Sequence, residues 1–381
     1  MAVKRLCAVA VLAAVAAGAG TAQDLMSGDE MPEAAEAMPG LDLQDPETGL
    51  IGKINAWLFY SSEDGVIGGA SGTFNLPSGE GRWMQLGGEV AEKRQSLTGI
   101  FHQDLAFGTP ASLDLTLRGS HDERRDALPF ETTTGGLEAR LTWPIGEAAT
   151  LGTYLGFSTN RIHNPEDDLS PLLAPDVRRS ERTAIGADYQ RTLDLGGGAL
   201  SRLRFGLGGE LASISSGESQ IRAQASVLAG GSLADGRMSW RGDLRMGLLE
   251  TSGGDSSIGD RFILGPATLR GFSYGGFGPR DGDQTLGGTR YAAARFDVKF
   301  PQTFGESALM PGLHADLGSL WGLDNTGGGA VDDDAHLRAS FGVTLSARFG
   351  AGSLDLSLSD AVVKRDGDDA QPLQLSFQSR F

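Results

Sequence analysis

Regular alternation of apolar and polar residues is the feature that most limits what this chain can fold into. In residues 337–349, Leu, Ala, Phe, Val, Leu, Ala and Phe occupy every second position, with Arg, Ser, Gly, Thr, Ser and Arg between them. The same pattern recurs in residues 291–300 and 354–359. Successive side chains of a β-strand point to opposite faces. Each segment therefore predicts a strand with one apolar and one polar face.

The composition supports an all-β chain. Glycine accounts for 57 of 381 residues, about twice its usual share, which predicts many turns or bulges and few long helices. After residue 23 there is no uninterrupted apolar run of about 18 residues, so helical membrane spans are not expected. Membrane-crossing strands leave no such run, and the alternation is compatible with a transmembrane barrel.

Sixteen candidate strands follow from Gly52 onwards, an even number, as in single-chain bacterial barrels. Their predicted ranges are 53–62, 66–75, 83–93, 96–105, 111–120, 135–144, 150–160, 182–193, 200–212, 220–231, 238–249, 289–300, 312–321, 336–349, 353–361 and 372–381. Connections after even-numbered strands are short or moderate, whereas several after odd-numbered strands are long. Outer-membrane barrels have short periplasmic turns and longer external loops. We therefore predict a transmembrane antiparallel β-barrel over residues 51–381.

The N-terminal residues predict export. Lys4 and Arg5 precede an apolar run of small residues, the layout of a cleaved secretory signal peptide over residues 1–23. Residues 24–50 are acidic and interrupted by prolines, and we expect a flexible segment there. The only cysteine, Cys7, lies in the signal peptide, so no disulfide is expected in the mature protein.

Charge and motifs argue against several function classes. The formal net charge of −17 makes nucleic acid an unexpected partner, because such proteins need basic patches. The five histidines show no metal-binding spacing, and no glycine run is followed by the Lys-Ser/Thr of a phosphate loop. We expect no metal and no cofactor. The acidic runs near residues 332–334 and 366–369 suggest solvated external loops rather than calcium sites.

One stretch, Gly271-Phe272-Ser273-Tyr274-Gly275, formally matches the nucleophile elbow of serine hydrolases. That motif needs a helix directly after the serine. Here the glycines and proline of residues 275–279 cannot start one. We therefore expect no catalytic residues and no enzyme.

The C-terminus predicts a membrane strand. Leu373, Leu375, Phe377 and Phe381 lie on one face, and the chain ends on an aromatic residue. This resembles the terminal strand by which the assembly machinery recognises outer-membrane proteins. An ordinary edge strand is the alternative, but such an apolar edge would invite aggregation in water.

The region from Arg261 to Phe381 resembles the barrel of the Omp85 superfamily, also called the bacterial surface antigen (D15) domain. The family pattern is an RGF or RGY tip, a Gly-Pro, a Gly-Gly, and then acidic positions on two successive strands. Here these elements are Leu269-Arg270-Gly271-Phe272, Gly278-Pro279, Gly287-Gly288, Ala294-Arg295-Phe296-Asp297 and Asp316.

The resemblance implies that the long loop between strands 11 and 12 folds inward. Asp297 and Asp316 fall on the polar phase of neighbouring strands, so Arg270 could bind both carboxylates there, with Gly271 and Phe272 at the loop tip. The alternative is an exposed loop with a solvated arginine. Family members that act on proteins usually carry POTRA domains before the barrel. Only 24–50 separates the signal peptide from the first strand, and we expect a barrel-only member.

The function implied is assistance in inserting or translocating proteins at the outer membrane of a Gram-negative bacterium. Its expected partners are outer-membrane lipid, lipopolysaccharide, unfolded outer-membrane proteins and a separate periplasmic protein. Two alternatives stay open. A sixteen-stranded barrel is wide enough for a passive solute pore, and the acidic loops would also suit a structural surface barrel.

Overall fold

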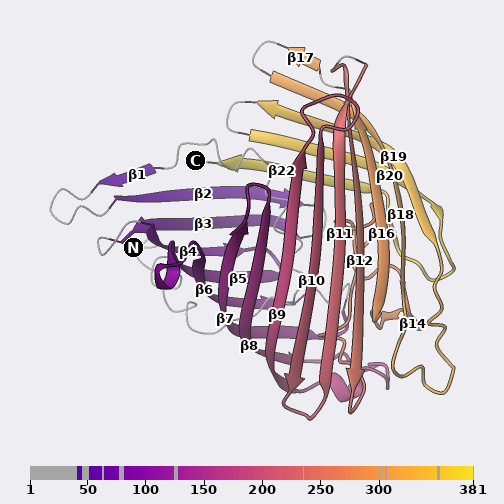
Figure 1. The fold of residues 1–381 in the computed structure, drawn as a ribbon. Coiled ribbons are helices and arrows are strands. Elements are labelled where there is room, and N and C mark those ends of the chain that lie inside the picture. Colours follow the sequence, from indigo (N-terminus) through magenta and orange to yellow (C-terminus); the bar gives the residue numbers. More distant parts are fainter. Residues whose placement is uncertain are drawn as a thin grey trace, which may run out of the picture.

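The computed structural model describes residues 41–44, 51–61, 64–76, 81–123, 128–234, 236–300, 302–304, 307–349 and 352–380. Within these ranges the chain is almost entirely β-structure (Figure 1). The barrel strands are β2 (Ile51–Ser61), β3 (Gly65–Asn75), β4 (Arg82–Val90), β5 (Arg94–Gln103), β6 (Ser112–Asp122), β7 (Glu131–Ile145), β8 (Ala149–His163), β9 (Arg179–Asp194), β10 (Arg202–Ile214), β11 (Ser219–Leu233), β12 (Met238–Ser252), β16 (Arg290–Lys299), β18 (Ser307–Trp321), β19 (Arg338–Phe349), β20 (Gly352–Val363) and β22 (Leu373–Arg380).

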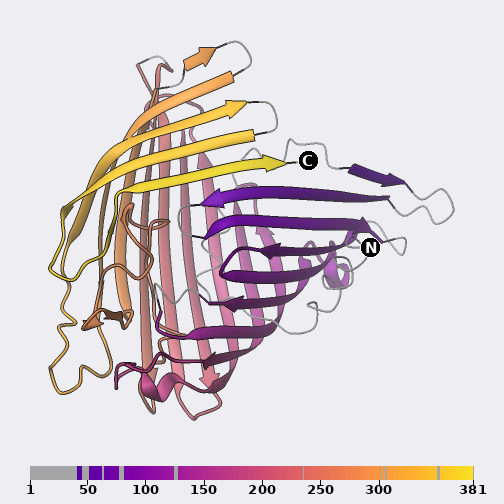
Figure 2. The same ribbon diagram turned by 180° about the vertical axis from the view of Figure 1, so that it is seen from behind.

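These sixteen strands form one closed antiparallel ring in the described part of the chain, which confirms the predicted fold. Each strand pairs with the next barrel strand along the chain, and β22 pairs back with β2 to close the ring. Figure 2 shows β22 beside β2 from the other side. Two short strands extend this sheet: β1 (Leu41–Gln44) on β2, and β17 (Gln302–Phe304) on β18.

The barrel exposes its apolar face and buries its polar one. Large apolar side chains on the outer face are strongly exposed, for example Leu155 at 58%, Ile185 at 60% and Leu207 at 62%. On β19, Phe341 and Val343 are exposed, as the alternation predicts. Such an arrangement would be unfavourable in water. In a membrane it places the apolar face of the barrel against the hydrocarbon of the lipid.

Strand β18 begins earlier than predicted. The expected range of 312–321 begins only after Pro311, and proline cannot donate a ladder hydrogen bond. The structure continues the strand back to Ser307, with β17 paired against its first residues. Pro311 lies between the segments paired with β16 and with β17, and its carbonyl accepts from the N–H of Phe300 at 2.8 Å. The strand thus tolerates the proline where the neighbouring ladder is interrupted.

The remaining elements are short. Two 3₁₀ helices, η4 (Ala106–Gly108) and η5 (Ala174–Asp176), lie between barrel strands. In the ranges that the structure describes, no helix has the length and apolar character to cross a membrane. Strand β1 falls within the segment 24–50 that was expected to be flexible, and the rest of that segment lies outside the described residues, as do residues 1–23.

Candidate functional site

Arg270 lies in the long connection between β12 and β16 and binds two carboxylates of the barrel wall. Its Nε and Nη2 donate to the Oδ2 and Oδ1 atoms of Asp316 at 2.8 and 2.6 Å. Nη1 and Nη2 donate to Asp297 at 2.6 and 3.2 Å. The backbone N–H of Arg270 also donates to Asp316 at 3.0 Å. One guanidinium therefore holds two carboxylates through bidentate, charge-assisted hydrogen bonds.

This group, which we call the arginine lock (Arg270, Asp297 and Asp316), is withdrawn from solvent. The side chains of Arg270 and Asp316 are 6% and 0% exposed, and that of Asp297 is 16% exposed. Asp297 lies on β16 and Asp316 on β18. Both side chains face the lumen, because the adjacent residues Phe296 and Leu317 are exposed on the outer face of the barrel. A buried charge without its partner is costly, so each member depends on the others.

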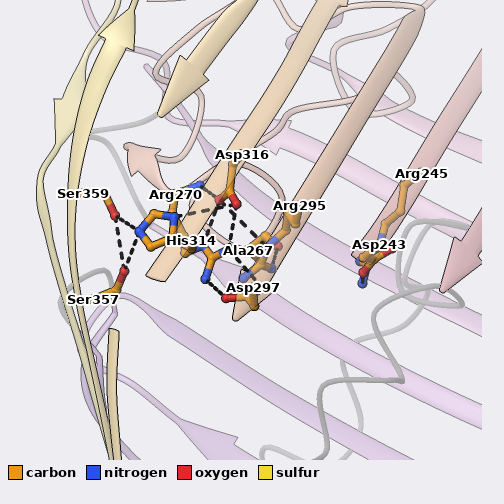
Figure 3. A network of polar contacts seen from close by, with 10 residues as sticks. All are labelled: Asp243, Arg245, Ala267, Arg270, Arg295, Asp297, His314, Asp316, Ser357 and Ser359. Carbon is orange, nitrogen blue, oxygen red and sulfur yellow. Dashed lines mark hydrogen bonds and ion pairs between the residues drawn. The ribbon is translucent and has the colours of Figure 1, made fainter. Parts of the chain in front are cut away.

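Further polar groups extend the arginine lock along the wall (Figure 3). The Nδ1 atom of fully buried His314 lies 3.7 Å from Oδ1 of Asp316, and its Nε2 atom is 2.9 Å from the hydroxyl of Ser359 on β20. On the other side, Arg295 donates to the backbone oxygen of Ala267 in the loop. The network therefore runs across β16, β18 and β20, and His314 and Ser359 were not anticipated from the sequence.

The loop tip packs tightly against the wall. Gly271 has a φ of +88°, and a β-carbon there would lie 3.1 Å from that of Ser340. Phe272 is fully buried and makes an edge-to-face contact with Phe277, with ring centroids 5.2 Å apart. Gly271–Phe272 forms the short strand β13, which pairs with β21 (Ala370–Gln371) of the last external loop. The tip is thus fixed by backbone pairing as well as by charge.

Two apolar clusters embed the loop. The first consists of loop and wall side chains: Leu249, Phe262, Leu264, Leu269, Phe272, Phe277, Tyr291 and Leu320. The second, which we call the loop cap, joins four external loops and adjoining strand ends: Phe130, Ile162, Leu173, Ile258, Ile263, Leu286 and Val331. The long loop contributes to both clusters, so it links the lumen wall to the external loops.

The expectation of solvated acidic loops was wrong for Asp368. Asp368 accepts from Nε and Nη2 of Arg338, both at 3.0 Å, and its side chain is 2% exposed. Asp324 and Asp369 are exposed as expected, but each also accepts a hydrogen bond from another loop: Asp324 from the backbone of Ser256, and Asp369 from the hydroxyl of Ser273 at 2.6 Å. Each of these carboxylates therefore connects its own loop to another segment of the chain.

Ser273 connects two loops by a hydrogen bond. Its hydroxyl donates to Asp369, and the residues after it form turns rather than a helix. The described residues do contain one group that could hold a metal ion, His121, Glu123 and Glu131, whose ligand atoms lie within 4.8 Å of one another. His121 and Glu123 are already hydrogen-bonded to each other at 2.8 Å.

The C-terminal residues lie on the closing strand. Leu373, Leu375 and Phe377 of β22 pair with Leu358, Leu356 and Leu354 of β20, in that order. Leu373 is 50% exposed, on the apolar outer face. Phe381 lies outside the described residues.

The chain belongs to the Omp85 superfamily. Residues 77–381 match the model of the Omp85 superfamily domain. Membership implies an outer-membrane barrel of a class concerned with assembly or transport rather than catalysis. A short segment of 46 residues is 52% identical to a SAM50-like protein of Schizosaccharomyces pombe, and it spans 12% of this chain and 10% of that protein.

Solved structures share the fold at low sequence identity. BamA from Haemophilus ducreyi, in a form lacking POTRA domains 1–3, matches with a TM-score of 0.74 at 18% identity. The match covers 87% of this chain and 70% of that one. CdiB from Escherichia coli matches with a TM-score of 0.59 at 13% identity, over 86% of this chain and 63% of that one.

Proposed function

We propose that this barrel assists the insertion or translocation of proteins at the outer membrane by opening between β2 and β22. The observation that carries the proposal is the short pairing at this seam. Among the described residues, β2 and β22 pair over five positions of β2, Trp57–Ser61, whereas β2 and β3 pair over ten. Fewer ladder hydrogen bonds make this junction the easiest to separate. Membership in the Omp85 superfamily supports the same reading.

The chain itself covers a further part of the seam edge of β2. Strand β1 pairs with Ile51–Ile54, and two residues separate them from the five that pair with β22. Because β3 occupies the other edge of β2, β1 and β22 share one edge. A substrate strand adding to β2 by β-augmentation would displace one of them.

The arginine lock supplies rigidity while the seam opens. Arg270 ties the loop to β16 and β18, and β13 ties it to the connection between β20 and β22. The wall that faces the loop can therefore stay in place when β22 separates from β2. In this proposal Gly271 and Phe272 act as structural parts of the loop tip, and Leu373, Leu375, Phe377 and Phe381 as the signal for the protein's own assembly.

Location and partners follow from the same proposal. The barrel resides in the outer membrane of a Gram-negative bacterium, in contact with lipid and lipopolysaccharide, after export through a signal peptide over residues 1–23. Its substrates are unfolded outer-membrane proteins, delivered by a separate periplasmic partner. Export is checked by N-terminal sequencing of the protein extracted from membranes, for which a start near Asp24 is expected.

A disulfide across the seam tests the mechanism. Ser61 and Ser376 are directly opposed on β2 and β22, and antiparallel partners lie within disulfide reach. The variant is Ser61→Cys/Ser376→Cys. The matched control, Asn55→Cys/Ser71→Cys, staples β2 to β3 away from the seam.

The readout is the rate at which an unfolded outer-membrane protein becomes protected from protease in liposomes containing the barrel. The seam disulfide should abolish the acceleration and reduction should restore it, while the control staple should have no effect. An oxidised seam variant that is as active as the reduced one would refute the mechanism. Liposomes with the wild-type barrel that give no acceleration would favour the passive pore or the structural barrel.

A further inference from the structure

A cavity of about 410 Å³ lies in the wall of the lumen, lined by residues of β7 to β12. Its β12 edge adjoins the arginine lock, because Arg241 is the register partner of Asp297. Its volume is in the range of small-molecule sites. The lining includes five arginines: Arg140, Arg204, Arg222, Arg241 and Arg245. It includes three carboxylates: Asp188, Glu210 and Asp243. The chain as a whole has a net charge of −17, so a net positive cavity is unlike the rest of the molecule.

Each lining carboxylate already has an arginine. Asp188 accepts from Arg140. Asp243 accepts from Arg245, with an Nη2 to Oδ2 distance of 2.7 Å. Glu210 accepts from Arg182, which is outside the lining, and from the hydroxyl of Tyr154 at 2.9 Å. Two further carboxylates lie beside this group: Glu138 pairs with Arg140, and Asp260 lies 3.9 Å from Arg182.

Arg222 is buried with donors to spare. Its side chain is 3% exposed, and its Nε atom is 3.9 Å from Glu210, beyond hydrogen-bond distance. Nη2 donates to the backbone oxygen of Asp260, and the guanidinium lies over the ring of Phe262, 4.8 Å from the centroid. Among the described residues, Nε and Nη1 have no hydrogen-bond partner. The loop thus orients the guanidinium of Arg222 but leaves two of its hydrogen-bond donors without a partner among the described residues.

The other unsatisfied groups of the lining are donors too. Nη2 of Arg140 and Nε2 of Gln224 are buried without a partner in the described part of the chain, and no lining residue there leaves a buried side-chain acceptor unsatisfied. A buried donor left unpaired costs free energy, and three lining side chains that carry such donors favour a ligand that only accepts. Guanidinium groups suit the oxygens of phosphate in particular.

The wall leaves room for such a ligand at Gly208. This residue of β10 lines the cavity, and the nearest atoms to a β-carbon there, the backbone oxygen of Ala187 and Cβ of Asp188, lie 3.9 Å away. The next residue, Gly209, also borders the cavity, but it is exposed and has no atom within 4 Å of a β-carbon. It shares the phase of Leu207 on β10, so a side chain there points to the outer face. The two glycines therefore offer a matched pair of substitutions.

We propose that this cavity binds a small soluble oxyanion of the phosphate class, held by Arg222, Arg140 and Gln224. The strands separate the site from the lipid, so the ligand enters through the lumen as a solute. The proposal does not depend on the insertion activity proposed above, because it concerns binding by the resting barrel.

The test is calorimetric titration of inorganic phosphate into the purified full chain, in zwitterionic detergent and about 0.15 M NaCl to screen loose surface binding. Wild-type protein should bind one phosphate saturably. Gly208→Leu, which fills the cavity and keeps every charge, and Arg222→Gln should each lower the affinity by at least about tenfold. Gly209→Leu should bind like wild type.

Heat-modifiable migration on gels checks that each variant is folded. Absence of saturable binding by the wild type would overturn the proposal. So would folded Gly208→Leu protein that binds phosphate as tightly as Gly209→Leu, because binding would then lie outside the cavity.

Discussion

His314 occupies the space directly above Gly342, its register partner on β19. A β-carbon at Gly342 would collide with Nε2 of His314 and with the backbone oxygen of Leu358. The imidazole reaches across β19 in this way and contacts Ser359 on β20. The absence of a side chain at one position therefore lets three strands share one hydrogen-bonding group.

Gly342→Ala should destabilise the barrel by about 1–3 kcal/mol, the usual cost of overpacking, because the backbone atom of Leu358 cannot move aside easily. Gly208→Ala is the control, since its nearest neighbours are 3.9 Å away. The measurement is the temperature at which each variant loses its folded migration on a gel. Equal transition temperatures for the two variants would contradict the packing argument.

Arg270→Ala should release the loop, because it leaves Asp316 buried without a partner. The expected cost to loop docking is about 3–5 kcal/mol. Arg270→Lys should recover only part of it, since an ammonium cannot bind both carboxylates bidentately. The measurement is hydrogen exchange across residues 262–288. The double variant Arg270→Ala/Asp316→Asn should be more protected than Arg270→Ala alone, and strictly additive effects would argue against direct coupling.

Deletion of residues 272–286 should raise single-channel conductance in planar bilayers. The deletion removes Phe272 and Phe277 from the lumen cluster and Leu286 from the loop cap. It keeps Arg270, so the wall charges stay paired. An unchanged conductance would show that these residues do not obstruct the lumen.

Asp176 gives a pH-dependent prediction. It lies beside the loop cap, and burial raises its pKa, although its carboxylate accepts from the backbone N–H of Ile258 at 2.8 Å. The folded pKa lies above the unfolded one, so the ionised group costs stability at neutral pH, and this cost disappears as the pH falls to about 4. Asp176→Asn should therefore be more resistant to urea than wild type at pH 7 and equal to it at pH 3.5.

The pKa of Asp332 is shifted in the opposite direction. The hydrogen bond from Arg365, with a second from His336, lowers the pKa of Asp332. Its stabilising effect is present above the ordinary pKa of about 4 and is lost as the pH falls through the lower folded value. Asp332→Asn should loosen its loop at both pH 7 and pH 5, as measured by limited proteolysis. A loss confined to pH 7 would contradict this assignment.

The barrel could be predicted from the sequence because alternation directly specifies which side chains face lipid and which face the lumen. The same parity places Asp297 and Asp316 on the lumen side of neighbouring strands. The contacts of His314 could not be predicted, since they depend on the empty space at Gly342. The surplus donors around Arg222 depend on six strands and on where Asp260 and Phe262 of the loop come to rest.

The expectation of solvated external aspartates failed at Asp368 for a related reason. A charged run in a glycine-rich loop looks solvated when it is read alone. Asp368 is buried only because Arg338 projects from the barrel rim beneath it, and Asp324 is engaged only because Ser256 lies on another loop. Contacts between loops that are distant in sequence leave no local pattern.

The loop cap also has a consequence for how this chain can change over time. Its four loops share one apolar cluster, so a substitution in one alters the packing surface offered to the other three. A single loop transplanted from a relative would meet three partners shaped for another sequence. The surface that this protein presents to its surroundings should therefore be inherited and engineered as a set of loops rather than one loop at a time.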